Sequence, residues 1–341
     1  MEQLFANIQP IMTASQLLEA SLTRELRSER SLPKRTTPLI KARIRESARI
    51  REAGGFIADR LGTVVSEFPN LESLHPFYRE LTAVVSDIGE LKRSLGALNW
   101  ASILIRGFAS RYSEKASRAG NPDRAAAARR EAYGRIRSVV KRVEGDLQFL
   151  EEARRKLSRL PSIDTTVVTL VVAGCSGVGK STLVKRISTA NPKVAGYPFT
   201  TREIILGHWE TPLGRVQVVD TPGLLDRPLA ERNRIELQAI IALRHLAAAI
   251  IFIADPSETC GYPCDYQLNL YQEIVRGFTS VPVVVALNKV DLVDAQRLEE
   301  ARKVFGGEAL ETIGTRGLGV KEVFERALLA ARSGFERSSV G

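Results

Sequence analysis

The stretch GCSGVGKS, which spans Gly174–Ser181, decides the fold of the second half of this 341-residue chain. It fits the pattern G-x-x-x-x-G-K-[ST], and it lies between an apolar, β-branched run at 167–172 and a helical pattern. In that setting the glycines let backbone N–H groups turn toward phosphate oxygens, and the helix N-terminus adds its dipole. Lys180 is predicted to reach the β- and γ-phosphates, and Ser181 to bind Mg²⁺. The residues predicted to cradle the nucleotide are Gly174, Cys175, Ser176, Gly177, Val178, Gly179, Lys180, Ser181 and Thr182.

Short β-branched runs alternate with helical stretches from residue 166 onward. The predicted strands are 167–172, 216–219, 250–254 and 281–287. Such alternation is typical of a mostly parallel sheet with helices on both faces. We therefore predict a three-layer α/β domain of the P-loop nucleotide-binding class over residues 164–341.

The tetrapeptide Asn288-Lys289-Val290-Asp291 follows the last of these strands and indicates the base. A carboxylate at Asp291 can accept hydrogen bonds from guanine N1–H and N2–H₂, whereas adenine has no 2-amino group. Asn288 is expected to hold the base edge and to tie it to the phosphate loop, and Lys289 to lie over the purine. A final base-contacting loop is predicted at Gly314 and Thr315, where the sequence is degenerate.

The stretch DTPG at 220–223 ends another predicted strand and matches the D-x-x-G pattern that senses a γ-phosphate. Asp220 is expected to hold Mg²⁺ through water, with Thr221 and Pro222 in the turn, and the Gly223 N–H to bond the γ-phosphate. The first switch loop is expected at Phe199, Thr200 and Thr201. The predicted metal ligands are Ser181, Thr201 and Asp220, with Thr200 as the alternative to Thr201. The predicted catalytic residues are Lys180, Thr201 and Gly223.

The N-terminal half has apolar residues at helical spacing and almost no alternating pattern, which predicts a bundle of four or five helices over residues 1–163. Its longest helix is expected at about 122–160. Pro161 interrupts the helical pattern, so the domain boundary is placed there.

The net charge of +10 belongs entirely to this helical half. Residues 1–163 hold 29 Lys and Arg against 19 Asp and Glu, whereas residues 164–341 hold 20 of each. Clustered cations favour a polyanion such as RNA; the alternative is an arginine-rich bundle whose charges are merely solvated. The candidate RNA contacts are Lys41, Arg45, Arg49, Arg135, Lys141 and Arg142.

Several function classes are disfavoured. The longest apolar run, 246–254, is far shorter than the roughly 20 residues of a membrane span. The N-terminus lacks the pattern of a secretory signal, and three cysteines do not make a disulfide framework. Cys260 and Cys264 are four residues apart, but the histidines are scattered, so a metal site built on them is not expected. We predict a cytoplasmic protein that is monomeric when free and binds neither membrane nor DNA.

Six further stretches resemble one family. They are AGYPFTT at 195–201, DTPGLLDRPLAERN at 220–233, DPSETCGY at 255–262, EFP at 67–69, LHPFY at 74–78 and SRLPSID at 158–164. Together they closely resemble the nucleolar GTP-binding protein (Nog) family, an Obg-type branch of the TRAFAC GTPases. The resemblance covers nearly the whole chain. The chain looks like an archaeal member of the family, without the long C-terminal extension of eukaryotic members.

The resemblance implies a helical domain and a GTPase domain that bind GTP, GDP and Mg²⁺ and act in large ribosomal subunit assembly through precursor particles and rRNA. Leu224 stands where Ras-like enzymes have a water-orienting glutamine, so hydrolysis is expected to be slow. Two alternatives remain open: an RNA-binding scaffold that nucleotide merely stabilises, and a regulatory GTPase that acts through a protein partner outside ribosome assembly.

Overall fold

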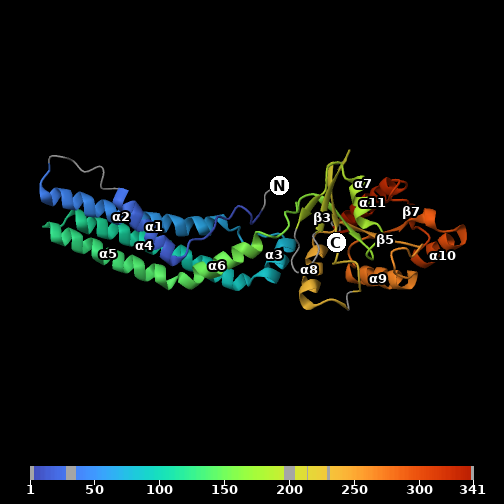
Figure 1. Cartoon of the computed structure of the whole chain (residues 1–341), viewed down its shortest axis with the longest axis horizontal. Coiled ribbons are helices and arrows are strands. Elements are labelled where there is room, and N and C mark those ends of the chain that lie inside the picture. Colours follow the sequence, from blue (N-terminus) through green and yellow to red (C-terminus); the bar gives the residue numbers. More distant parts are fainter. Residues whose placement is uncertain (1–3, 28–35, 196–203, 213, 229–230, 339–341) are drawn as a thin grey trace. The chain divides into compact units, whose positions relative to one another are not determined.

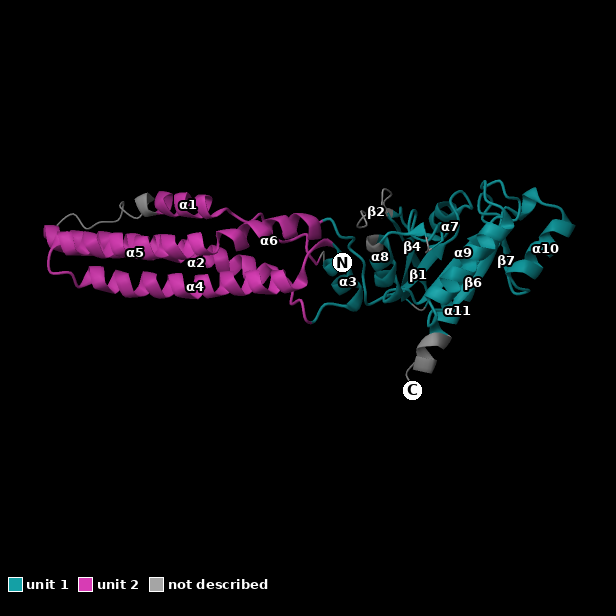
Figure 2. Ribbon diagram, turned by 90° about the horizontal axis from the view of Figure 1, so that it is seen from below, with its two compact units in different colours: residues 1–3, 73–84, 159–341 teal, residues 4–72, 85–158 magenta. Residues whose placement is uncertain are grey.

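The computed structural model describes residues 4–27, 36–195, 204–212, 214–228 and 231–338. The chain forms two compact units, which Figure 2 colours separately. A helical unit comprises residues 4–72 and 85–158, and a sheet unit comprises 73–84 together with the chain from 159 onward. None of the helices in these described ranges is both long enough and apolar enough to cross a bilayer.

The first six helices precede the sheet (Figure 1). They are α1 (Ala14–Arg27), α2 (Pro38–Glu67), α3 (Pro76–Val85), α4 (Ile88–Ser117), α5 (Pro122–Arg142) and α6 (Glu144–Leu157). The side chains of Thr37, Asp87 and Asn121 cap α2, α4 and α5 by accepting from backbone N–H groups of the first turn. Five of the six helices, all but α3, belong to the helical unit.

The helix predicted at 122–160 is two helices, with the break at Val143. Lys141 and Arg142 lie in the last turn of α5, and Glu144 and Asp146 lie in the first turn of α6. Each set of charges has the sign that favours its helix end, so the local sequence supports a termination followed by a new start.

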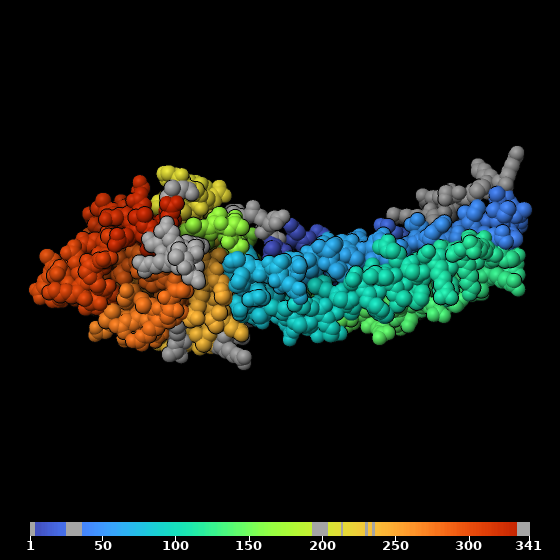
Figure 3. Space-filling view, turned by 180° about the vertical axis from the view of Figure 1, so that it is seen from behind, coloured from blue at the N-terminus to red at the C-terminus, as the bar shows by residue number. Residues whose placement is uncertain are grey.

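Helices α2 and α4 pack along each other, and the blue and cyan surfaces of this pair lie side by side in Figure 3. Small residues allow the close approach. A Cβ placed on Gly54 would lie 2.6 Å from the Cβ of Ala109, and the Ser102 hydroxyl donates to the Ala58 carbonyl at 2.8 Å. Substitution at Gly54 therefore requires the two helices to separate.

Among the described residues, the sheet unit has seven strands in the order β2-β3-β4-β1-β5-β6-β7. They are β1 (Val168–Ala173), β2 (Lys193–Ala195), β3 (Ile204–Thr211), β4 (Gly214–Asp220), β5 (Ala249–Ala254), β6 (Val283–Asn288) and β7 (Leu310–Thr312). The strands from β4 through β1, β5 and β6 to β7 pair in parallel, and β2-β3-β4 pair antiparallel. The predicted mostly parallel sheet is confirmed; β2, β3 and β7 are additional strands.

Helices lie on both faces of the sheet, as Figure 1 shows. They are α7 (Lys180–Ile187), α8 (Arg234–Arg244), α9 (Cys264–Gly277), α10 (Ala295–Phe305) and α11 (Val320–Ser338), with a short 3₁₀ turn, η3 (Val290–Leu292). Helices α7 and α11 contact strands on one side, and α9 packs on β5 from the other, where Phe252 meets Tyr271. The three-layer α/β class is therefore confirmed.

The sheet unit also contains α3, which differs from a single boundary at 163/164. The buried Tyr78 hydroxyl lies 2.8 Å from the Ile163 carbonyl oxygen and accepts from the Ile163 N–H at 2.8 Å. Burial raises the pKa of Tyr78 to about 12, so the hydroxyl keeps its proton. These bonds attach α3 to the segment that leads into β1.

Candidate nucleotide site

The phosphate loop joins the end of β1 to the start of α7, as predicted. Lys180 is buried, and its ammonium donates to the carbonyl oxygens of Gly174 at 2.7 Å and Cys175 at 2.8 Å. The loop therefore wraps around the lysine side chain, which places a positive charge at the N-terminus of α7. That arrangement favours an anion.

The glycines of this loop are required by backbone conformation and by space. Gly179 has φ +106° and a Cβ there would lie 2.4 Å from Nδ2 of Asn288. Gly174 has φ +131° and a Cβ there would lie 2.3 Å from the Ile253 carbonyl oxygen. L-residues rarely adopt such φ values, so these positions tolerate glycine alone without rearrangement.

Asp220 at the end of β4 faces Ser181 in the first turn of α7. The Ser181 hydroxyl donates to Oδ2 of Asp220 at 2.5 Å, while Oδ1 is buried and has no hydrogen-bond partner in the described part of the chain. Burial raises the pKa of Asp220, an effect that Ser181 and Lys180 partly offset. A hydroxyl beside a carboxylate with one unpartnered oxygen fits a hard cation such as Mg²⁺. The third predicted ligand, Thr201, and the neighbouring Phe199 and Thr200 lie outside the described residues.

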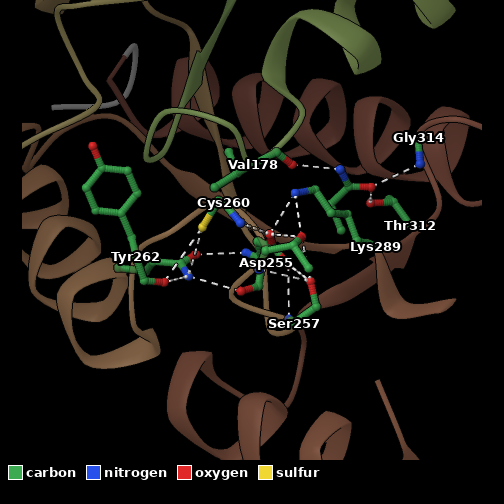
Figure 4. Close-up of polar contacts among 11 residues, drawn as sticks. Val178, Asp255, Ser257, Cys260, Tyr262, Lys289, Thr312 and Gly314 are labelled. Atoms are coloured by element: carbon green, nitrogen blue, oxygen red, sulfur yellow. Dashed lines mark hydrogen bonds and ion pairs between the residues drawn. The ribbon is translucent and has the colours of Figure 1, made fainter. Parts of the chain in front are cut away.

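Asn288, the last residue of β6, joins two loops, and Figure 4 labels its partners Val178, Thr312 and Gly314. Its Nδ2 donates to the Val178 carbonyl at 2.8 Å, so the predicted tie to the phosphate loop is present. Its Oδ1 accepts from the Gly314 N–H at 3.0 Å and from the Thr312 hydroxyl at 3.0 Å. The phosphate loop and the final loop are thereby fixed to each other through one amide.

The two remaining predicted base contacts reach the surface. The Asp291 side chain is 26% exposed, and the Nη2 atom of Arg316 lies 3.9 Å from its Oδ2. Thr315 is exposed, and its carbonyl accepts a hydrogen bond from Arg186. Both positions leave the side chains accessible to a ligand.

Lys289 has a partner that the sequence did not indicate, the fully buried Asp255 at the end of β5 (Figure 4). The Lys289 ammonium lies 2.8 Å from Oδ2 of Asp255 and 2.9 Å from the Thr259 hydroxyl. The Ser257 and Cys260 N–H groups also donate to this carboxylate. The loop at 255–260 therefore positions Lys289.

The same loop touches the phosphate loop. A Cβ on Gly177 would lie 3.4 Å from both the Cα and the carbonyl oxygen of Cys260. Gln267 of α9 fixes the loop by accepting from the Asp255 N–H at 2.8 Å and donating to the carbonyls of Asp255 and Tyr262. The sequence signal that could have indicated Asp255 is a polar residue at the carboxyl end of a buried strand, because Asp220 and Asn288 also lie at such ends.

The turn after β4 is held internally. The Thr221 hydroxyl donates to the Val172 carbonyl at 3.1 Å, so this side chain is buried in the fold. Pro222 is partly buried, and the Gly223 N–H donates to Oδ2 of Asp226 at 2.9 Å. The Gly174 N–H donates to the Leu225 carbonyl at 3.0 Å, which attaches the turn to the phosphate loop.

The cysteines carry no metal site in the described ranges, where no group of three or more His, Cys, Asp or Glu side chains comes together. Cys175, Cys260 and Cys264 are free thiols. Burial raises the pKa of Cys175 to about 12 and that of Cys264 to about 11, so both remain protonated at neutral pH.

Two of the predicted RNA contacts on α2, Arg45 and Arg49, lie beside an acidic residue. Glu46 is buried on α2, and Arg45 and Arg49 of α2 and Arg129 of α5 lie within 3.5 Å of its carboxylate. Burial alone would raise the pKa of Glu46, but these cations lower it. The Arg49 side chain is only 15% exposed, so its charge is directed inward.

Other cations of this unit are exposed and lie over aromatic rings. The Arg142 guanidinium lies 5.1 Å from the ring centre of Trp100, and that of Arg135 lies 5.8 Å from Phe108. Lys141 is also exposed, and Lys41 is half-buried. Cations interleaved with aromatic rings can contact both phosphates and unstacked bases.

Comparisons with known proteins agree with this architecture. The family model for the NOG1 N-terminal helical domain matches residues 5–164, and the model for nucleolar GTP-binding protein 1 (NOG1) matches residues 234–291. An uncharacterised protein of Methanocaldococcus jannaschii is 40% identical over 296 residues, which are 86% of this chain and 83% of that protein.

Nucleolar GTP-binding protein 1 of Encephalitozoon cuniculi is 35% identical over 300 residues, which are 88% of this chain and 57% of that protein. A solved structure of a Plasmodium falciparum protein assigned as nucleolar GTP-binding protein 1 is 30% identical, with a TM-score of 0.46, over 53% of this chain and 94% of that one. The chain thus spans little more than half the length of its Encephalitozoon relative.

Proposed function

The chain belongs to the nucleolar GTP-binding protein 1 family, and we propose that it is a slow, Mg²⁺-dependent GTPase that acts as a switch in assembly of the large ribosomal subunit. The observation that carries the guanine-nucleotide part is the Asn288 amide, which ties the phosphate loop at Val178 to the final loop at Gly314. This tie brings the phosphate-binding and base-binding elements into one site, with Asp291 at its exposed edge.

In the proposed reaction, water attacks the γ-phosphorus in line with the leaving oxygen, and the chain supplies positioning and charge. Lys180 neutralises charge on the β- and γ-phosphates from the centre of its loop. Bound Mg²⁺, held by Ser181, Asp220 and Thr201, would stabilise the charge that develops on the phosphate oxygens. The Gly223 N–H bonds the γ-phosphate and loses that bond on hydrolysis.

A slow intrinsic rate follows from Leu224, whose side chain is fully buried and apolar. It cannot orient the attacking water, and in this proposal a group from outside the chain speeds turnover. The pre-ribosomal particle is the proposed source, and a cytoplasmic site of action is part of the proposal.

The proposed RNA contacts lie on the helical unit, which holds most of the basic surplus of the chain. Of the six predicted contacts, Lys141, Arg142 and Arg135 are exposed and Arg45 is 42% exposed, whereas Arg49 is turned inward onto Glu46. We therefore place the principal contacts on α5, with Trp100 and Phe108 beside them. Several phosphate contacts predict a steep fall of log affinity with log salt.

The experiment is sedimentation of the full chain with large-subunit precursors, loaded with either a non-hydrolysable GTP analogue or GDP. We expect more protein in the particle fraction with the analogue. Absence of binding in both states at low salt, with nucleotide binding confirmed by titration, would refute the ribosome assignment and leave a GTPase with another partner.

Charge variants of the full chain identify the RNA surface better than a deletion of residues 1–163, because that deletion would also remove α3 from the sheet unit. The double variant Lys141→Gln/Arg142→Gln should weaken particle binding about tenfold or more and reduce the salt slope by about two, with GTP affinity unchanged. The matched control is Lys321→Gln/Arg332→Gln, which removes two exposed cations from α11 of the sheet unit. Equal losses in both variants would contradict a specific α5 surface.

A further inference from the structure

The backbone N–H of Gly223, the predicted γ-phosphate sensor, is already occupied by a carboxylate. It donates to Oδ2 of Asp226 at 2.9 Å, three residues further along the same turn. A carboxylate oxygen and a phosphate oxygen are both anionic acceptors, and they compete for this N–H because two anions so close together repel each other. The inference that follows rests on the proposed function, because it assumes that nucleotide binds beside this turn.

Asp226 is held in place by a buried arginine. The Arg232 side chain is 0% exposed; its Nη2 donates to Oδ1 of Asp226 at 2.8 Å, and its Nη1 donates to the Gly223 carbonyl at 2.5 Å. The guanidinium therefore bridges the carboxylate and the glycine that the carboxylate caps. Such charge-assisted bonds within a buried site are stronger than neutral ones and restrict the geometry.

The arginine is in turn coupled to the start of α8. Oε1 of Glu236 lies 3.8 Å from Nη1 of Arg232 and 3.0 Å from Nη2 of Arg227. Glu236 and Asn233 form a reciprocal capping pair, in which each side chain accepts from the backbone N–H of the other. Movement of Asp226 therefore reaches the first turn of α8 through a continuous series of ion pairs and caps.

We propose that Asp226 is an internal substitute for the γ-phosphate and sets the preference of this protein between GTP and GDP. GTP has to displace the carboxylate from the Gly223 N–H before its own oxygen can bind there, whereas GDP, which has no γ-phosphate, leaves the contact intact. The contact lowers GTP affinity relative to GDP affinity. When GTP does bind, the displaced Asp226 releases Arg232 and with it the Glu236 cap, so the nucleotide state changes the start of α8.

The test measures two affinities of the full chain in Mg²⁺ buffer, one for fluorescent GDP and one for a fluorescent non-hydrolysable GTP analogue. Asp226→Asn keeps the size of the side chain but removes its charge. We expect analogue affinity to rise on the order of tenfold while GDP affinity stays within about twofold, because a charge-assisted competitor becomes a neutral one. The control is Asp265→Asn, an exposed carboxylate in the first turn of α9 that should leave both affinities unchanged.

Arg232→Gln provides a second route, because it loosens Asp226 without altering the carboxylate itself. It should shift the ratio of the two affinities in the same direction. An unchanged ratio in both variants, or an equal loss of both affinities, would show that Asp226 is only structural and would overturn the proposal. Failure of the unmodified chain to bind either nucleotide would refute the proposed function instead, so the two failures are distinguishable.

Discussion

The ammonium of Lys289 lies 2.8 Å from Oδ2 of Asp255, and the two residues follow neighbouring parallel strands of the sheet. Burial alone would raise the pKa of Asp255, but the hydrogen bond and charge of Lys289, with the Ser257 and Thr259 hydroxyls, lower it. The carboxylate is therefore ionised at neutral pH and holds the lysine at the carboxyl ends of β5 and β6.

Removal of the negative charge of Asp255 should weaken the binding of both GDP and GTP. Asp255→Asn leaves the Lys289 ammonium without its anionic partner, so we expect about tenfold lower affinity for GDP and for a GTP analogue alike, together with a loss of about 1–3 kcal/mol in the free energy of unfolding. Titration with fluorescent nucleotide and urea denaturation check this. Unchanged affinity would show that Lys289 does not need positioning. Asp255→Asn should lower the affinities for GDP and for the GTP analogue equally, whereas Asp226→Asn should change the ratio of these two affinities.

Asp291 should determine the choice of base. In Asp291→Asn the side chain loses one acceptor and gains an N–H₂ donor, which no longer matches the guanine N1–H and N2–H₂ donors. We expect GTP affinity to fall at least about a hundredfold. Affinity for xanthosine triphosphate, whose base has a carbonyl where guanine has its 2-amino group, should rise. Competition between the two nucleotides measures this. A variant that retains full GTP affinity would contradict the role assigned to Asp291.

The α2–α4 crossing predicts opposite effects at adjacent glycines. Gly54→Ala places a methyl group 2.6 Å from the Ala109 Cβ and should destabilise the protein by about 1–3 kcal/mol. Gly55→Ala meets nothing within 4 Å and should stabilise the helix by up to about 1 kcal/mol. Denaturant unfolding of both variants checks this; equal effects would mean that the crossing is not tightly packed.

Glu151 gives the helical unit an acid-sensitive contact. A hydrogen bond from Arg154, with others from the Ile11 N–H and Arg155, lowers the pKa of Glu151 from 4.5 to about 2. Because the folded-state pKa is the lower one, the stabilisation is complete above pH 4.5 and is lost as the pH falls from there toward 2. Glu151→Gln should therefore show a shallower decline of stability over that range.

The exposed neighbour Glu152, paired with Lys156, provides the comparison. Glu152→Gln should resemble the unmodified protein, since a surface pair contributes little. Thermal melts between pH 5 and 3 distinguish the variants. Identical pH profiles for all three proteins would argue against the Glu151 contact.

The phosphate loop could be predicted from sequence because its geometry depends on the loop itself. Gly174 and Gly179 need left-handed backbone, and few other residue types satisfy that condition. Asp220 and Asn288 could be predicted for a similar reason, since each ends an apolar strand whose neighbours are known from the order of the motifs.

Asp255 could not be predicted in the same way, because its partner depends on sheet register. The parallel pairing of Ala254 with Leu287 is what brings Asp255 next to the Asn288-Lys289 pair, 33 and 34 residues later. The Asp226–Arg232 contact likewise depends on how the turn folds back, which spacing alone does not determine.

The exposure of the predicted RNA contacts on α2 could not be predicted from the sequence. The four-residue spacing places Arg45 and Arg49 on one side of α2, but it does not determine whether that side faces solvent or the other helices. Glu46 is buried and receives Arg129 from α5, 83 residues away, which turns the Arg49 charge inward. Long-range ion pairing thus decides which cations remain available.

The bonds between Tyr78 and Ile163 have a consequence for synthesis of the chain. Helix α3 leaves the ribosome about 80 residues before its hydrogen-bond partner, and the intervening residues 85–158 complete the helical unit first. The bonds between the Tyr78 hydroxyl and Ile163 therefore form only after the segment leading into β1 emerges. Phe77 and Leu81 of the same helix are fully buried in the finished protein. Attachment of α3 to the segment before β1 is therefore a late step of synthesis, and the order of translation sets when it can occur.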